Sequence, residues 1–357
     1  MAGPLKVAKA AAHRLRRRPA NDRHDTDREA TPRTPPRGAH PAARLVRGAL
    51  RCGALLARRA LLLAALLALV FAAVELLPGD AADATSDHGE SAAEIAERRA
   101  LLGLDRPVTE RFLDWMTALP TGDFGTSARG EPVRALLSGP FPNTLLLGGL
   151  ALLLTVLVSV ALGCWAALRP HGAVDRTISA TATAVLALPE FVVAVGLVLV
   201  LALWTDLLPA VTTANAEGRP ASWEMLVLPV LALSIPQIGW NTRIVRAALA
   251  DEAKAPHVET AVLDGLPARR VLTHHVLPGA LPAIAAGAAT STGMLLGGAV
   301  VVETVFNYPG VGGVLASAVT DRDTPVIAAV VMLTGAVISG VLLIADLIRD
   351  RAAGGRT

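Results

Sequence analysis

The sequence predicts an all-α membrane protein with about six transmembrane helices. Of its 357 residues 53% are hydrophobic, and the mean hydropathy is +0.50. The apolar residues gather into long blocks, and about 20 residues at about 1.5 Å each are enough to cross a hydrocarbon core of about 30 Å. The predicted spans are Ala54–Leu77, Leu145–Leu168, Ala180–Leu208, Leu226–Ala247, Leu281–Val302 and Pro325–Ile348.

The segment before the first block, residues 1–53, is basic and rich in Arg, Pro and Ala. Residues 1–55 hold 13 Lys and Arg against 4 Asp and Glu. Such a composition buries too little apolar surface to offset the entropy of ordering, so we predict a disordered cytoplasmic tail. A role in binding nucleic acid or anionic lipid is the less favoured alternative, and no nucleic-acid partner is expected. The charged region is also too long for a signal peptide.

The rest of the chain divides into three parts. Residues 54–142 are expected to hold the first transmembrane helix, where Arg58 and Arg59 snorkel to the interface, and an extracytoplasmic segment. Residues 143–350 form the transmembrane core, with a long loop at 248–280, and residues 351–357 form a second cytoplasmic tail.

The connecting charges set the predicted orientation. Lys and Arg concentrate on cytoplasmic loops, especially short ones. Basic residues occur at 169–179, at 248–280 and after the last block, namely Arg169, Arg176, Lys254, Arg269, Arg270, Arg349, Arg351 and Arg356. The alternate loops carry mainly Asp206, Glu217, Glu224, Asp321 and Asp323. Both termini are therefore predicted to be cytoplasmic in a multi-pass protein of the bacterial plasma membrane, in contact with membrane lipid.

Several residues in or beside the blocks leave more than one interpretation. Small residues such as Gly293 and Gly297 favour packing within the chain over packing against a partner. Prolines such as Pro189 either kink a span or mark its end. The acidic Glu75 and Glu303 lie at block ends, where interfacial solvation is favoured over a proton relay.

Patterns typical of enzymes are mostly missing from the sequence. None of the three lysines lies in a Gly-Lys-Ser/Thr phosphate-binding loop, and there is no His-Glu-x-x-His pair. Adjacent His274 and His275 point to different helix faces, which disfavours a metal site. Cys52 and Cys164 do not suggest a disulfide framework. We expect no cofactor and no catalysis, and ATP hydrolysis cannot come from a phosphate-binding loop of this chain.

The loop at 248–280 is the most informative segment. A short helix over residues 257–264 is expected to end at Gly265, with Pro267 in the first turn of a second helix. The residues expected to form an exposed apolar stripe are Leu263, Leu266, Val271 and Leu272. Such a stripe suits a groove on another protein, and a helix lying on lipid headgroups is the alternative.

This loop resembles the cytoplasmic loop of the permeases of ABC importers. The family form is Glu-Ala-Ala, three residues, Gly, nine residues, Ile-x-Leu-Pro; here Thr260 replaces Ala and His275 replaces Ile. The loop residues that the resemblance singles out are Glu259, Ala261, Gly265, Leu266, Leu277 and Pro278. Flanking motifs similar to the peptide and nickel subfamily are Leu76–Asp80, Leu102–Pro107, Gly122–Ser127, Pro142–Leu146, Val302–Gly312 and Arg322–Val326. Structural roles are expected for Pro78, Gly79, Asp80, Gly122, Asp123, Glu303, Pro309, Gly310 and Gly312.

The resemblance covers residues 54–350 and implies the transmembrane domain of a type I, MetI-like importer. It implies a peptide or nickel transporter in which a second homologous permease, two ABC ATPase subunits and an extracytoplasmic solute-binding protein are the partners. The loop would then be the coupling helix that seats in the ATPase. The alternative is an independent channel or secondary carrier, although the paired repeats and buried charge pairs of carriers are not found.

Overall fold

The computed structural model describes residues 41–86 and 90–354, and nearly all of them are helical. The described residues from Gly53 onward form one compact unit. In the described part of the chain, β-structure is limited to two isolated bridges, Thr126 with Pro132 and Ala214 with Pro220. In chain order the helices are α2 (Pro41–Glu75), α3 (Ala81–Ala84), α4 (Ala92–Leu101), α5 (Val108–Ala118), the 3₁₀ turn η1 (Leu119–Thr121), α6 (Val133–Ser138), α7 (Pro140–Leu168), α8 (Ala173–Leu186), α9 (Glu190–Leu197), the π-helical η2 (Val198–Trp204), α10 (Glu224–Glu252), α11 (Pro256–Leu263), α12 (Ala268–Val271), the π-helical η3 (Leu272–Val276), α13 (Leu277–Val305), α14 (Val311–Thr320) and α15 (Thr324–Gly354).

Helix α2 begins earlier than the sequence predicts. It starts at Pro41, so residues 41–53 of the predicted disordered tail are helical. The rest of that tail, residues 1–40, lies outside the described residues. At the other end of the chain α15 continues to Gly354, into the tail predicted from residue 351.

Five helical segments are long and apolar enough to cross a membrane, and a bent pair brings the number to six if it counts as one span. The bent pair is α8 with α9–η2, which corresponds to the predicted span at 180–208. The two parts meet at about 100°. Pro189 is the N-cap of α9, and because a proline disfavours helical geometry in the residue before it, the break falls at this position. The third span is therefore a broken helix.

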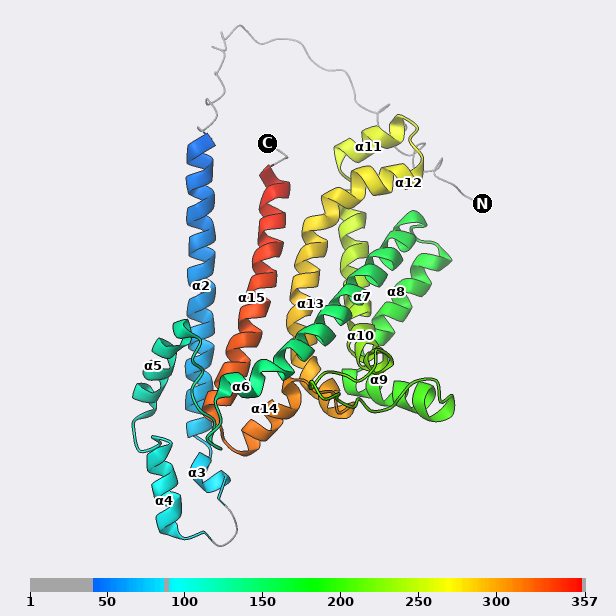
Figure 1. Ribbon diagram of the computed structural model, residues 1–357. Coiled ribbons are helices and arrows are strands. Elements are labelled where there is room, and N and C mark those ends of the chain that lie inside the picture. The colour runs from blue at the N-terminus through cyan, green and yellow to red at the C-terminus, as the bar shows by residue number, and fades with distance from the viewer. Residues whose placement is uncertain (1–40, 87–89, 355–357) are drawn as a thin grey trace. The chain divides into compact units, whose positions relative to one another are not determined.

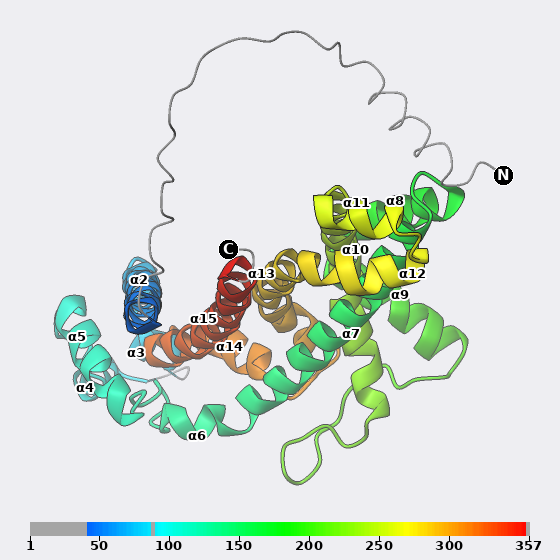
Figure 2. The ribbon, with the colours of Figure 1, turned by 90° about the horizontal axis from the view of Figure 1, so that it is seen from above.

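Helix α10 lies at the centre of the core and packs against α7, α8, α9 and α13. In its most apolar window 56% of the residues are buried, against 11% for the first span. Gly239 allows α10 to approach α8 closely, because a methyl group at this position would lie 2.6 Å from the carbonyl oxygen of Ala182 on α8. Figure 2 looks down on the end that carries α11 and shows these helices grouped together, with α2 and α15 to one side.

An ion pair joins α2 to α15. The Arg59 guanidinium donates to Asp346 and to the carbonyl oxygen of Ser339, both at 2.6 Å. The side chains of Arg59 and Asp346 are only 17% and 20% exposed. Arg59 therefore does not snorkel to the interface as predicted, because it finds an acidic partner on another helix.

The segment between α2 and α7 lies at the end of the helices opposite α11 (Figure 1). Phe71 of α2 contacts Phe112 and Trp115 of α5, with ring centroids 5.3 and 5.6 Å apart. Asp323, in the turn between α14 and α15, accepts a hydrogen bond of 2.7 Å from the Ala128 amide. Burial raises the pKa of Asp323, and the hydrogen bond from Ala128 offsets part of that rise. The segment is thus tied both to the first span and to the last turn.

Candidate functional site

Helix α11 is the short helix that the sequence predicts in the loop after α10. Pro256 occupies its first turn, where the missing amide hydrogen removes no helical hydrogen bond. At the other end Gly265 has φ of +75°, a left-handed conformation that glycine adopts without strain. The Gly265 amide donates to Val262 at 3.1 Å and the Leu266 amide to Ala261 at 3.3 Å, which is the hydrogen-bond pattern of a Schellman motif.

One face of α11 is buried and the other is exposed. Val258 and Ala261 are 3% and 4% exposed, whereas Val262 and Leu263 are 57% and 77% exposed. Glu259 is also exposed, in the first turn of the helix. The exposed apolar surface therefore consists of two adjacent residues near the C-terminal end of α11, beside the turn at Gly265.

The predicted exposed stripe is wrong for three of its four residues. Val271 and Leu272 are buried at 7% and 8% exposure, and Leu266 is partly buried. They turn inward because α12 packs back against the ends of the long helices, and helical periodicity in a loop does not reveal which face has a neighbour. Of the four, only Leu263 is exposed.

The buried face of α11 belongs to a continuous apolar cluster that we call the loop core. It connects α11 with α7, α10, α12, η3 and α13, so that a force on α11 reaches three long helices through packed side chains. Its buried members are Val245, Leu249, Val258, Ala261, Val271, Leu272, Val276, Ala280 and Ile284, with Val160, Cys164, Ala167, Ala248, Ala255, Leu266 and Leu277 packed against them.

Polar contacts add to this packing. The His257 ring nitrogen Nε2 lies 3.2 Å from the carbonyl oxygen of His275, which ties α11 to η3. The same nitrogen is 3.8 Å from a Glu252 carboxylate oxygen at the end of α10. No local pattern predicts this contact, because it depends on a backbone carbonyl 18 residues away.

The path from α12 to α13 is one continuous helix despite Pro278. A proline inside a helix lacks the amide hydrogen and its ring crowds the preceding turn. Here the π-helical turn η3 immediately precedes Leu277 and Pro278, and such a turn provides the looser backbone that accommodates the ring. Pro278 is exposed and Leu277 is partly buried against the loop core.

Glu303, at the other end of α13, is buried. Only 1% of it is exposed. Its carboxylate accepts hydrogen bonds of 2.6 Å from the Thr144 hydroxyl of α7 and from the Gly312 amide of α14. Interfacial solvation, predicted for this residue, is therefore wrong; the carboxylate joins three helices instead. Glu75 does lie at the surface, where it pairs with Arg111 at 3.1 Å.

Glycines make room for the buried Glu303. A methyl group on Gly310 or Gly312 would overlap the carboxylate. Beside them the Pro309 carbonyl oxygen accepts a hydrogen bond of 2.7 Å from the Asn143 side chain. The residues singled out between 303 and 312 thus form one structure with the start of α7.

The remaining residues singled out lie in the segment after α2, far in the chain from the loop core. Asp80 caps α3 and pairs with Arg99 at 2.6 Å, and the preceding Gly79 has φ of +81°. Gly122, with φ of +76°, ends η1. Asp123 accepts a hydrogen bond of 2.8 Å from the Gly125 amide. Pro78 lies in the turn between α2 and α3. All of these residues shape turns.

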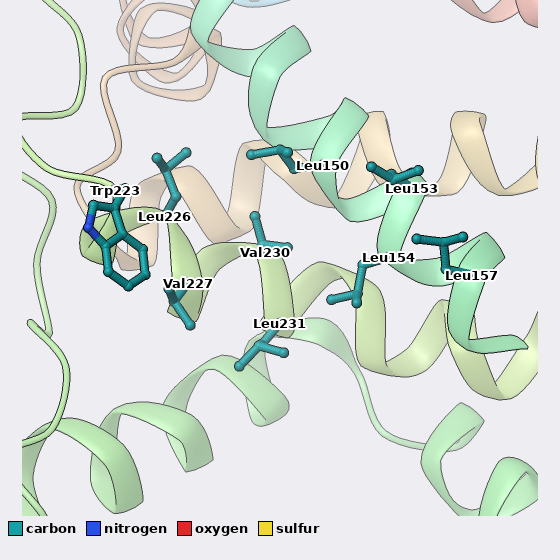
Figure 3. Close-up of a pocket in the computed structure, with 9 residues that line it drawn as sticks. All are labelled: Leu150, Leu153, Leu154, Leu157, Trp223, Leu226, Val227, Val230 and Leu231. Carbon is teal, nitrogen blue, oxygen red and sulfur yellow. The ribbon is translucent and has the colours of Figure 1, made fainter. Parts of the chain in front are cut away.

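The surface also has an apolar groove of about 410 Å³ between α7 and α10 (Figure 3). Its walls include Leu150, Leu154, Val230 and Trp223. Among the side chains that line it, only the Trp223 indole carries a hydrogen-bonding atom. The groove therefore has no group that suits a charged solute. Across residues 41–86 and 90–354, no three His, Cys, Asp or Glu side chains are grouped in a way that could hold a metal ion.

Together, the spans and the loop core define a class: a multi-pass membrane protein with a short helix packed onto the ends of its central helices. Residues 159–353 match the model of the family described as the binding-protein-dependent transport system inner membrane component. The chain belongs to this family.

Similar proteins include a probable peptide ABC transporter permease protein, y4tP, of Sinorhizobium fredii, which is 33% identical over 79% of this chain and 90% of its own length. The oligopeptide transport system permease protein AppB of Bacillus subtilis is 31% identical over 78% of this chain and 90% of its own. The glutathione transport system permease protein GsiC of Salmonella choleraesuis is 35% identical over 74% and 85%. Among solved structures, an inward-facing MetNI methionine ABC transporter matches at a TM-score of 0.41 and 18% identity, covering 60% of this chain and 91% of that one.

Proposed function

We propose that this chain is the permease subunit of an ATP-driven importer of short peptides and that α11 is its coupling helix. The observation that carries the proposal is the two-sided character of α11: Val258 and Ala261 fasten it to the loop core, while Val262 and Leu263 remain exposed. An exposed apolar pair on a rigidly held helix suits a groove on a partner protein. The relatives named as peptide, oligopeptide and glutathione permeases support the substrate class.

In this proposal two ABC ATPase subunits bind the face that carries α11, which is cytoplasmic together with both termini. A second homologous permease completes the pathway, and an extracytoplasmic binding protein delivers the solute to the opposite end. Closure of the ATPase pair moves α11, and the loop core passes that movement to α7, α10 and α13 as rigid bodies. Nickel is the alternative solute, and peptides are favoured by the names of the relatives.

The test compares two exposed leucines. Leu263 of α11 is 77% exposed and Leu101 of α4, outside the candidate spans, is 81% exposed. In cells that carry the other subunits, Leu263→Asp is expected to abolish uptake of radiolabelled trialanine and co-purification of the ATPase, because a carboxylate cannot enter an apolar groove. Leu101→Asp, at the opposite end of the molecule, keeps co-purification of the ATPase. Glu259→Lys, which reverses a charge on the same helix, is expected to reduce uptake too. Normal uptake and co-purification in Leu263→Asp would refute the coupling role of α11.

A further inference from the structure

An open surface cavity with both polar and apolar walls lies between α8 and α10, separate from the loop core and from the apolar groove. Its volume is about 380 Å³. It is lined by Ser179, Thr183, Trp240, Arg243, Ile244, Arg246 and Ala247. It occupies the half of these helices that is nearer to α11, because Trp240 is 12 residues from the end of α10 and Ser179 is in the second turn of α8.

The cavity has hydrogen-bond donors that no described residue satisfies. The Trp240 indole Nε1 and the Ser179 hydroxyl are both buried without a partner in the described chain. An indole nitrogen can only donate, and a buried polar group left without a partner is destabilising. Arg246 is held by Asp175 on α8, at 2.5 and 2.9 Å. Arg243, also in the lining, is exposed and makes no hydrogen bond or ion pair with any described residue.

These groups together suit an anion. Two unpaired donors and an unpaired guanidinium point to a ligand that accepts several hydrogen bonds and carries negative charge, and Arg matches the planar geometry of a carboxylate. A neutral or cationic ligand would leave the guanidinium unmatched. The cavity therefore has the chemistry of a carboxylate site.

An unpaired acid lies further along the same face of α10. Glu190, the first residue of α9 after the break, is partly buried and has no hydrogen-bond or ion-pair partner among the described residues. A methyl group on Gly298 of α13 would meet both the Glu190 carboxylate and the Leu233 side chain of α10 at 3.5 Å, so Glu190 lies against these two helices. A carboxylate within a candidate membrane span points to a functional role.

The two features are aligned along α10. Leu233 and Trp240 are seven residues apart and therefore lie on the same helix face, about 10 Å from one another along the axis. The face of α10 that carries Trp240 and Arg243 lies opposite the face that meets α7 through Val245. Glu190, which lies beside Leu233, is thus about two helical turns of α10 from the donors at Trp240, on the face of α10 opposite α7.

We propose that this face of α10 binds short peptides by both ends: the carboxylate in the cavity at Trp240, Ser179 and Arg243, and the α-ammonium group at Glu190. The proposal rests on the peptide class proposed above. A peptide of two or three residues spans about 7–11 Å when extended, which is comparable to the axial rise of about 10 Å between Leu233, beside Glu190, and Trp240. A phospholipid offers a phosphate for the cavity, but its ammonium group lies too close to that phosphate to reach Glu190.

The experiment measures binding to the assembled transporter in lipid nanodiscs without its binding protein, so that only the membrane subunits select the peptide. The probes are radiolabelled trialanine, trialaninamide, which lacks the carboxylate, and N-acetyltrialanine, which lacks the ammonium group. Trialanine is expected to bind at least tenfold more tightly than either analogue, since each lost charged hydrogen bond costs about a factor of ten.

The variants assign each end of the peptide. Arg243→Gln weakens trialanine binding about tenfold. Trp240→Phe, which keeps an aromatic ring but lacks the indole donor, weakens it a few-fold. Both variants leave the binding of trialaninamide unchanged. Glu190→Gln weakens trialanine binding but not that of N-acetyltrialanine. Arg176→Gln is the matched control, because Arg176 is an exposed arginine of α8 outside the cavity, and it changes none of these affinities.

Equal binding of trialanine and trialaninamide to the wild-type transporter would overturn the proposal. The proposal would also be overturned if Arg243→Gln removed co-purifying phosphatidylglycerol but left trialanine binding unchanged. That result would identify a lipid phosphate as the anion in the cavity. If the wild-type transporter imports trialanine and all variants match it, this inference fails and the proposed function stands. If the wild-type transporter imports no peptide, the proposed function fails.

Discussion

Substitutions at Gly265 separate a backbone requirement from a spatial one. Gly265 ends α11 with φ of +75°, and no atom lies within 4 Å of the place a β-carbon would take. Any cost of a side chain therefore comes from the left-handed backbone. For alanine this cost is about 1–2 kcal/mol, a factor of about 5–30 in the population that holds the turn. The cost of the left-handed conformation is smaller for asparagine, whose side chain hydrogen-bonds locally, and larger for β-branched valine.

The assay is ATP-dependent uptake of radiolabelled trialanine, divided by the amount of permease in the membrane. The expected order of uptake is glycine, then asparagine, alanine and valine. Asparagine is larger than alanine, so the order follows φ preference and not size. If Gly265→Ala transports better than Gly265→Asn, space at the docking surface limits the site and the backbone argument is refuted.

Three further substitutions test the packing of the core by the thermal midpoint of the purified protein in detergent. Arg59→Leu should lower the free energy of unfolding by about 2 kcal/mol, because breaking a fully buried pair costs about 3–5 kcal/mol and this pair is partly exposed. The double variant Arg59→Leu with Asp346→Leu should regain part of this lost stability. If Arg59→Leu alone is as stable as the wild type, the ion pair does not contribute as expected. Glu303→Gln replaces one acceptor oxygen with an amide nitrogen that cannot accept from the Thr144 hydroxyl or the Gly312 amide, which should cost about 1–3 kcal/mol, and an unchanged midpoint would show that the carboxylate is not needed. Gly239→Ala should destabilise by about 1–3 kcal/mol through overlap with α8, whereas Gly297→Ala, with open space around it, should not; equal midpoints for the two would contradict the close approach.

Part of the loop that carries α11 could be predicted from short-range signals in the sequence. Pro256, Gly265 and Pro267 are separated by a few residues, and their backbone preferences act locally, so the helix and its end were predicted within one residue or so. The position of Pro189 likewise indicated a kink or an end, and the structure shows a break of about 100° there. The inward turn of Val271 and Leu272 could not be predicted, since it depends on the ends of α10 and α13.

The class of fold, the family and nearly all of the spans could be predicted from the order of the residues, because hydropathy and turn preferences are properties of neighbouring residues. The partners of the charged groups, in contrast, depend on how the helices pack. Glu303 meets Thr144, 159 residues away, and Arg59 meets Asp346, 287 residues away. Whether a charge near a span end is solvated or buried depends on what another helix places beside it, and no local pattern carries that information.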